Sequence, residues 1–426
     1  MAVVIHPSRS AWEELVRRPS LDVSALFDTV RPVLEEVKQQ GDAAVIRYGE
    51  KFDGVRLTSL AVTEEEMQAA PTQLPEALKQ AIRTAAGHIA KFHAAQRFDG
   101  QRVETSPGVV CWQKALAIEK VGLYIPGGTA PLFSTVLMLA VPARIAGCRE
   151  IVLCTPPSRD GSVHPAILFA AATAGASRVF KAGGIQAVAA MAYGTESVPK
   201  VYKIFGPGNQ YVTAAKQLVS LQDVAIDMPA GPSEVEVIAD ENANPVFIAT
   251  DFLSQAEHGA DSQSILLTTS ESIVAPLLRA IESQLEQLPR KEITAKALRN
   301  SRIIVLRDRR ELIDFTNLYA PEHLIIQTSD YASLAEEIVN AGSIFLGAYT
   351  PESAGDYASG TNHTLPTNGH ARAYSGVNLD SFIRKITFQE ITPEGIRQLG
   401  ETIRVMAAGE QLDAHRNAVT VRLETI

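Results

Sequence analysis

The sequence predicts an α/β protein built from two doubly wound, Rossmann-like parallel-sheet domains, with small helical segments at its N- and C-terminal ends. Two observations predict this class. Strand-like runs alternate regularly with helical segments over residues 118–346. The runs are almost continuously apolar, as in IVLC at 151–154, which is typical of strands buried on both faces. Alternation of this kind builds parallel sheets with helices on both sides.

Size, charge and cysteine content narrow the class of protein. The 426 residues suffice for two to four domains, and a hydrophobic content of 46% is ordinary for a globular enzyme. The net charge of −9 argues against nucleic acid or an anionic membrane as the main partner. We expect neither a signal peptide nor a transmembrane segment. Three cysteines, Cys111, Cys148 and Cys154, form no even framework, so we expect a soluble protein of the reducing cytoplasm.

The chain divides into four expected parts. These are an N-terminal helical segment, an α/β domain that carries the candidate metal and acid–base residues, an inserted α/β domain with the candidate nucleotide site, and a C-terminal helical domain. Their boundaries are, in the same order, residues 1–20, residues 21–123 together with 234–378, residues 124–233, and residues 379–426.

The elements follow one another in a regular order. Before residue 100 the apolar residues recur at helical spacing, and Gly41 is expected to end the first long helix. Strands are predicted at 109–113, 118–125, 150–154, 178–181, 200–205, 235–239, 264–268, 303–306, 324–327 and 343–346. Helices are predicted at 21–40, 78–96, 132–147, 164–175, 186–193, 209–221, 245–258, 273–287, 311–319 and 331–341. Thr392 followed by Pro393 predicts the start of a C-terminal helix.

Three predicted strands of the inserted domain end in glycine-bearing turns, IPGG at 125–128, AGGIQ at 182–186 and FGPGN at 205–209. Ligands of open α/β sheets lie outside the carboxyl ends of the strands, where helix N-termini present N–H groups to an anion such as pyrophosphate. None of the turns matches GxGxxG, and tight turns need glycine for positive φ even without a ligand. A nucleotide site and a purely structural turn therefore both remain open.

Gln255 and His258 are candidates for a metal site. They lie three apart in a helical segment, so both side chains leave one face of the helix. Imidazole is a common metal ligand and a glutamine amide a rare one, so charged partners are needed. Asp356 offers a hard anionic oxygen of the type that zinc accepts. A helix-end histidine and a turn aspartate are the structural alternatives.

Glu322 and His323 are candidates for acid–base chemistry. They directly precede a predicted strand, a position from which a rigid scaffold can present side chains to a substrate. A histidine can shuttle a proton, and a neighbouring glutamate can deprotonate water. A surface pair at the end of a helix is the structural alternative.

Seven strings of this chain, in order, resemble histidinol dehydrogenase. They are VGLYIPGGTAPLFSTVLM at 121–138, FGPGNQYVTAAK at 205–216, IDMPAGPSE at 226–234, SQAEHG at 254–259, APEHL at 320–324, ESAGDYASGTNH at 352–363 and GEQLDAHRNAVTVR at 409–422. The resemblance implies oxidation of L-histidinol to L-histidine through histidinal, with NAD and one zinc ion per subunit of a homodimer.

The resemblance also implies residue roles. The zinc ligands would be Gln255, His258, Asp356 and His415, and the acid–base pair Glu322 and His323. NAD would contact Tyr124, Gln186 and Asn209, and the substrate would contact Ser233, Glu410, His323 and the zinc ligands. The segment with Glu410 and His415 would reach into the active site of the neighbouring subunit.

The implied chemistry is consistent with these residue types. Glu322 can activate the water that converts the aldehyde to a gem-diol, and His323 can accept the proton in both oxidations. A thiohemiacetal on cysteine is the other route, but none of the three cysteines has a sequence setting that lowers a thiol pKa. The rival hypotheses are a zinc hydrolase, a binding module without turnover, and a dehydrogenase of another amino alcohol.

Overall fold

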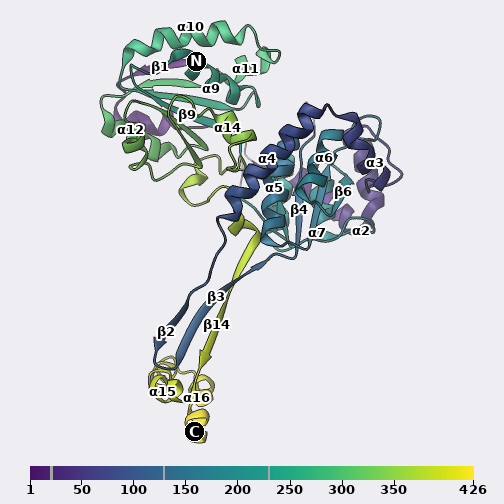
Figure 1. Ribbon diagram of the computed structural model, residues 1–426, viewed down its shortest axis with the longest axis vertical. Helices are drawn as coiled ribbons and strands as arrows, with labels where there is room; N and C mark the ends of the chain where they lie inside the picture. Colours follow the sequence, from purple (N-terminus) through teal and green to yellow (C-terminus); the bar gives the residue numbers. More distant parts are fainter. Residues whose placement is uncertain (20–22, 128–129, 229–230) are drawn as a thin grey trace.

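The computed structural model describes residues 1–19, 23–127, 130–228 and 231–426. The predicted helix start at Leu21 and Gly128 of the first glycine turn lie outside these residues. Two large lobes each contain a parallel sheet, and a long arm carries a third, antiparallel sheet (Figure 1). Both parallel sheets have helices on both faces, which confirms the prediction of two doubly wound, Rossmann-like sheets.

The first lobe is built on a five-stranded sheet in the order β6-β5-β4-β7-β8, with all neighbouring strands parallel. Counted from the first strand along the chain, this is the Rossmann order 3-2-1-4-5. The strands are β4 (Lys120–Tyr124), β5 (Glu150–Thr155), β6 (Arg178–Lys181), β7 (Lys203–Phe205) and β8 (Ala225–Ile226).

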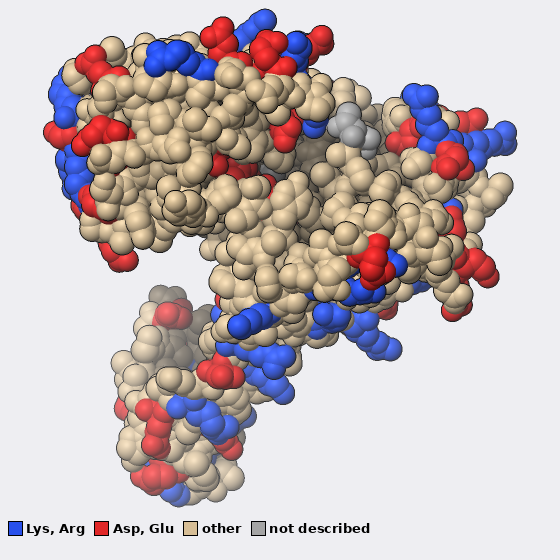
Figure 2. All heavy atoms as spheres, turned by 45° about the horizontal axis from the view of Figure 1, so that its top comes forward, with Lys and Arg blue, Asp and Glu red and all other residues tan. Residues whose placement is uncertain are grey.

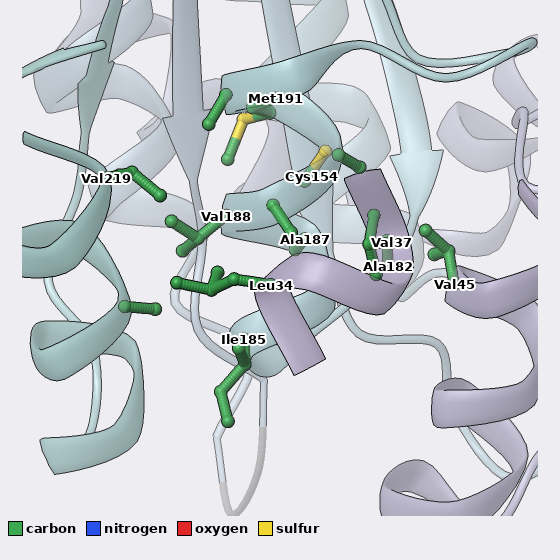
Figure 3. Packing of buried hydrophobic residues seen from close by; sticks show 14 of the residues in the cluster. Leu34, Val37, Val45, Cys154, Ala182, Ile185, Ala187, Val188, Met191 and Val219 are labelled. Carbon is green, nitrogen blue, oxygen red and sulfur yellow. The ribbon is translucent and has the colours of Figure 1, made fainter. Parts of the chain in front are cut away.

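Two layers of helices cover this sheet. One face carries α4 (Glu76–Ala94), α5 (Phe133–Ala146) and α6 (Pro165–Ala174), with α3 (Glu64–Ala69) beside them. The other carries α2 (Phe27–Asp53), α7 (Gly184–Tyr193) and α8 (Gln210–Ser220). Leu34 of α2 lies beside Val188 of α7 in the buried layer, and Val37 of α2 lies near Ala182 (Figure 3). The expected break at Gly41 is present, because its φ of 54° and ψ of −135° interrupt α2.

The packing of α2 and α4 corrects one expected domain boundary. Residues 21–123 were expected to join residues 234–378, yet α2 and α4 pack on the five-stranded sheet. Their apolar faces show helical spacing, which predicts a buried face but does not specify the sheet that covers it.

The second lobe is built on a six-stranded parallel sheet in the order β1-β11-β10-β9-β12-β13. Its strands are β1 (Ala2–Ile5), β9 (Glu234–Ala239), β10 (Gln263–Thr268), β11 (Arg302–Val305), β12 (His323–Gln327) and β13 (Ser343–Leu346). Strands β9 to β13 repeat the 3-2-1-4-5 order, and β1 extends the edge beside β11. Within the segment 1–20, which was expected to be helical, β1 precedes the short helix at Trp12–Leu15.

Helices again cover both faces of this sheet. One face carries α9 (Pro245–Ala256), α10 (Val274–Leu285) and α11 (Lys291–Ala297). The other carries α1 (Trp12–Leu15), α12 (Arg309–Tyr319) and α13 (Tyr331–Ala335). A short helix, α14 (Glu352–Tyr357), follows β13 and contacts α9.

The arm combines two distant parts of the chain. The antiparallel strands β2 (Arg102–Ser106), β3 (Val109–Ala117) and β14 (Ile383–Ile391) extend away from both lobes, and α15 (Pro393–Gly409) and α16 (Asp413–Thr425) lie at the far end (Figure 1). Residues 379–426 were expected to form a helical segment; its helices α15 and α16 are present, and the nine-residue β14 precedes them. Nowhere in the described ranges is a helix both long and apolar enough to cross a membrane.

Candidate active site

The candidate acid–base pair, Glu322 and His323, lies at the amino edge of the six-stranded sheet. Glu322 directly precedes β12, His323 is its first residue, and the neighbouring strand β9 begins at Glu234. Ligands of doubly wound sheets usually bind at the opposite, carboxyl edge. Here the C-terminal end of α9 returns to the amino edge, because it leads into the start of β10. This topology brings Gln255 and His258 to the same edge as Glu322 and His323.

The backbone of Glu234 holds both members of the pair. Its N–H donates to Oε2 of Glu322 at 3.0 Å, and its carbonyl oxygen lies 3.2 Å from Nδ1 of His323. A carbonyl can only accept, so Nδ1 carries a hydrogen and Nε2 of the neutral ring presents a lone pair. That Nε2 is buried, without a hydrogen-bond partner among the described residues, and lies 3.9 Å from Oδ1 of Asp356. The ring is therefore oriented as a proton acceptor.

Carboxylates dominate the electrostatics around His323. Burial lowers the pKa of His323, but Glu352, Glu322 and Asp356 outweigh burial and hold the pKa well above its ordinary value. Nδ1 lies 3.6 Å from Oε2 of Glu322 and 3.9 Å from Oε1 of Glu352. Three carboxylates surround the single imidazole of His323. Their excess negative charge favours the binding of an additional cation at this site.

Three side chains form a candidate metal site. The ligand atoms of His258, Glu352 and Asp356 all lie within 4.8 Å of one another. Gln255 is fully buried, and both of its amide atoms lack a hydrogen-bond partner within the part of the chain that the structure describes. The N–H of His258 donates to the carbonyl of Gln255 at 3.3 Å, so the two residues lie on one turn. An imidazole and two carboxylates close together, with a buried, unpaired amide on the same turn as the imidazole, fit a divalent cation such as zinc.

Glu352 is the residue that sequence reasoning missed. It is buried, and its Oε2 lacks a hydrogen-bond partner in residues 1–19, 23–127, 130–228 and 231–426. Burial raises its pKa well above the ordinary value, while the neighbouring His323 opposes that shift. The signal that could have found it is its spacing of four from Asp356, which puts both carboxylates on one face of α14.

A cavity of about 580 Å³ connects this edge with the first lobe. Asn209, Ser233 and His258 all line it. Figure 2 shows the hollow between the lobes with acidic atoms inside it. Asn209 caps α8, because its Oδ1 accepts from the N–H groups of Tyr211 and Val212 at 3.0 and 3.1 Å. These two N–H groups at the start of α8 are therefore already hydrogen-bonded, although the sequence had suggested them as donors to an anion.

The other two expected nucleotide contacts lie at the carboxyl edge of the five-stranded sheet. Tyr124 is buried at the end of β4, and its hydroxyl accepts from the N–H of Gly184 at 3.1 Å. Gln186 is buried in α7 and donates to Asp53 at 3.3 Å. Gly206 allows the close packing here, because a Cβ at this position would lie 2.0 Å from the carbonyl oxygen of Tyr124.

Glu410 and His415 lie away from the other expected ligands of the same chain. Both are exposed, Glu410 after α15 and His415 in α16, at the far end of the arm (Figure 1). The structure thus brings His258 and Asp356 together, and Gln255 lies on the same turn as His258. His415 of the same chain is not part of this cluster.

Two Rossmann-like lobes, with a buried candidate acid–base pair and a candidate metal site beside the cavity between them, are typical of an α/β enzyme. A profile of the family described as histidinol dehydrogenase matches residues 16–423. Histidinol dehydrogenase of Bacteroides thetaiotaomicron is 66% identical over 426 residues, all of both chains. The chloroplastic histidinol dehydrogenase of Arabidopsis thaliana is 52% identical over 98% of this chain and 90% of that protein.

Comparison of structures agrees with these matches. The crystal structure of histidinol dehydrogenase from Elizabethkingia anophelis superposes with a TM-score of 0.98 at 55% identity, covering 100% of this chain and 98% of the other. The chain therefore belongs to the histidinol dehydrogenase family, and it is an oxidoreductase.

Proposed function

We propose that the enzyme catalyses the NAD-dependent, four-electron oxidation of L-histidinol to L-histidine through L-histidinal, in histidine biosynthesis. Family membership supports the substrate class. The observation that carries the proposal is the buried Nε2 of His323, which lies 3.9 Å from Asp356 and has no hydrogen-bond partner in the described ranges. The three free thiols suit the cytoplasm that we propose as its compartment.

The metal in this proposal is zinc. Gln255, His258, Asp356 and a His415 from a second subunit would hold it, with Glu352 as a further carboxylate beside them. When bound, zinc supplies a positive charge and a template for the imidazole and amine of histidinol. The same charge would oppose the carboxylates that raise the pKa of His323, and so favour its neutral, proton-accepting form.

His323 acts in both oxidations, and Glu322 acts in the addition of water between them. In the first, Nε2 of His323 accepts the hydroxyl proton as a hydride leaves the carbinol carbon for NAD, which gives the aldehyde. Glu322 next takes a proton from the water that adds to the aldehyde, while His323 returns its proton to the aldehyde oxygen, which gives a gem-diol and leaves His323 neutral again. His323 accepts the proton of one gem-diol hydroxyl as the second hydride leaves, and the carboxylic acid results. Burial of both residues limits competing water.

We also propose that the enzyme is a homodimer with shared active sites. The exposed position of Glu410 and His415 on the arm supports this, because they could serve only a site that the arm reaches in another molecule. The arm also exposes several apolar side chains. They are Val103, Ile386, Phe388, Ile391, Val405, Met406, Leu412 and Val421. A row of this kind on a projecting element is suited to packing against a second copy.

One experiment tests the reaction. Purified enzyme with L-histidinol should reduce two NAD per histidine formed, followed as NADH absorbance with amino-acid analysis of the product. Absence of NADH with histidinol, but NADH with another amino alcohol, would move the enzyme to a different substrate. Amide cleavage without NAD would favour a hydrolase instead.

The role of Glu322 is tested by separating the two steps. Glu322→Gln should slow the oxidation of added histidinal more than that of histidinol in single-turnover measurements, because only the second step consumes water. An equal loss in both steps would contradict a role in water activation. His323→Gln should slow both steps and provides the comparison.

A further inference from the structure

We infer that Arg18 is a positioning residue for the acid–base pair, and that it acts through Glu234 and through the turn that precedes Glu322. This inference rests on the proposed roles of Glu322 and His323. Arg18 lies far from both residues in sequence, just before the described part of the chain breaks at residue 20. Its guanidinium is nevertheless almost buried, with 11% of the side chain exposed.

The guanidinium of Arg18 connects two backbone segments. Nη2 donates to the carbonyl of Tyr319 at 2.6 Å and to that of Ala320 at 3.3 Å. Nε and Nη2 donate to the two carboxylate oxygens of Glu234, the second at 3.2 Å. The charged group also lies over the ring of Tyr319, with 3.9 Å between Cζ and the ring centroid. One planar group thus bridges the end of α12 and the start of β9.

These two segments position the acid–base pair, which lies at the start of β12. The start of β9 holds the pair directly, through the N–H of Glu234 to Glu322 and the carbonyl of Glu234 to His323. The end of α12 leads into the pair through Ala320, a non-glycine residue with a left-handed φ of 52°. Such a backbone is strained and persists only where its surroundings hold it. The contacts of Arg18 to the carbonyls of Tyr319 and Ala320 provide that restraint.

The charge of Arg18 is needed because Glu234 is buried. Only 2% of the Glu234 side chain is exposed, and its neighbours include the hydroxyl of Tyr319 at 3.1 Å and the carboxylate of Glu322. A buried carboxylate without a cation would protonate or move, and its backbone would follow. Lysine carries the same charge but lacks the planar fork that reaches a carboxylate and two carbonyls together.

The test compares Arg18→Ala and Arg18→Lys with Arg17→Ala. Arg17 is the matched control, because it is an exposed neighbour that pairs with the exposed Glu14. For Arg18→Ala we expect kcat to fall by about tenfold to a hundredfold, the loss that a small displacement of a catalytic group causes. The KM for NAD and the zinc content should change by less than about twofold, because the cavity and the ligands are not touched. Arg17→Ala should match the wild type.

Rescue separates positioning from simple loss of structure. Millimolar guanidinium should restore part of the kcat of Arg18→Ala and leave Arg17→Ala unchanged, and Arg18→Lys should recover less than guanidinium does. If Arg18→Ala does not fold, Glu234→Gln keeps the packing and should show the same selective fall in kcat. A wild-type kcat in Arg18→Ala, or in Glu234→Gln, would overturn the inference. An unaltered kcat in His323→Gln would instead overturn the proposed function.

Discussion

Nε2 of His323 lies 3.9 Å from Oδ1 of Asp356, and no hydrogen-bonding group of the described chain occupies that nitrogen. The ring is fixed from its other side, where Nδ1 lies 3.2 Å from the carbonyl of Glu234. Nε2 is therefore fixed beside the candidate metal ligands, where it could accept a proton from a substrate bound to the metal. The predictions below follow from this arrangement and from the groups around it.

Replacement of His323 should remove the base and leave the metal site. For His323→Gln we expect kcat with histidinol to fall by about a hundredfold or more, the usual worth of a positioned general base. Zinc content, measured by mass spectrometry of the metal, should stay near that of the wild type. His164→Asn is a control, because asparagine can replace His164 as the cap of α6. Loss of zinc from His323→Gln would assign that ring to the metal.

Glu352 should contribute to metal binding. Glu352→Gln keeps the shape of the side chain and removes its charge from the cluster with His258 and Asp356. We expect zinc affinity to fall by about tenfold to a hundredfold in competition with a chelator, in the range seen for groups that support metal ligands. Glu257→Gln, beside His258 in sequence, is the matched control. An unchanged affinity in Glu352→Gln would exclude Glu352 from the metal site, and His258→Ala should empty the site outright.

His415 should serve a site in a second molecule. His415→Ala and His323→Gln should each be nearly inactive alone. Mixed dimers should regain activity, because the subunit with intact His323 receives His415 from its partner, and the other site lacks both residues. Dimers can be mixed by co-expression with two affinity tags and assayed as NADH formation. Activity no higher than that of either parent would place His415 in the site of its own chain, or in none.

No cysteine should be required for turnover. Burial raises the pKa of both Cys148 and Cys154 to about 12, so neither thiol ionises near neutral pH. Cys111 lies in β3 on the arm, opposite Gln389 of β14. The triple alanine variant should keep kcat within about threefold of the wild type, since no thiol supplies nucleophilic catalysis. Loss of histidinal oxidation in a folded triple variant would replace the gem-diol route with a thiohemiacetal.

Glu236 should make folding stability depend on pH. Burial raises the pKa of this β9 residue to about 8, against about 4.3 in an unfolded chain. Between these values the unfolded state releases a proton that the folded state keeps, so this residue lowers stability as pH rises from about 4.3 to about 8. Glu236→Gln should remove that slope.

Denaturant unfolding at several pH values measures this effect. The stability of Glu236→Gln relative to the wild type should rise by about 1.4 kcal/mol per pH unit within the window and level off above it. The exposed Glu241→Gln is the control and should show no comparable trend. A flat difference between Glu236→Gln and the wild type would mean that Glu236 is ionised in the folded protein.

Local sequence was sufficient to predict the fold class and to select part of the candidate site. Alternating strand and helix periods predict two doubly wound sheets, because each element needs a buried face whose spacing is visible within a few residues. Candidate site residues that are close in sequence were also selected from local spacing. Examples are Gln255 with His258 and Glu322 with His323. These pairs are adjacent on one turn or one strand start, so their proximity needs no tertiary information.

Tertiary structure alone decided which distant segments meet. The apolar face of α2 could have covered either sheet, and β14 joined β3 in the arm across more than two hundred residues. Arg18 reaches Glu234, and Glu352 joins His258, only because the amino edge of one sheet gathers strand starts and helix ends. Periodicity records which face of an element is buried. It does not record which partner buries that face, because this depends on complementary shape and charge between whole layers.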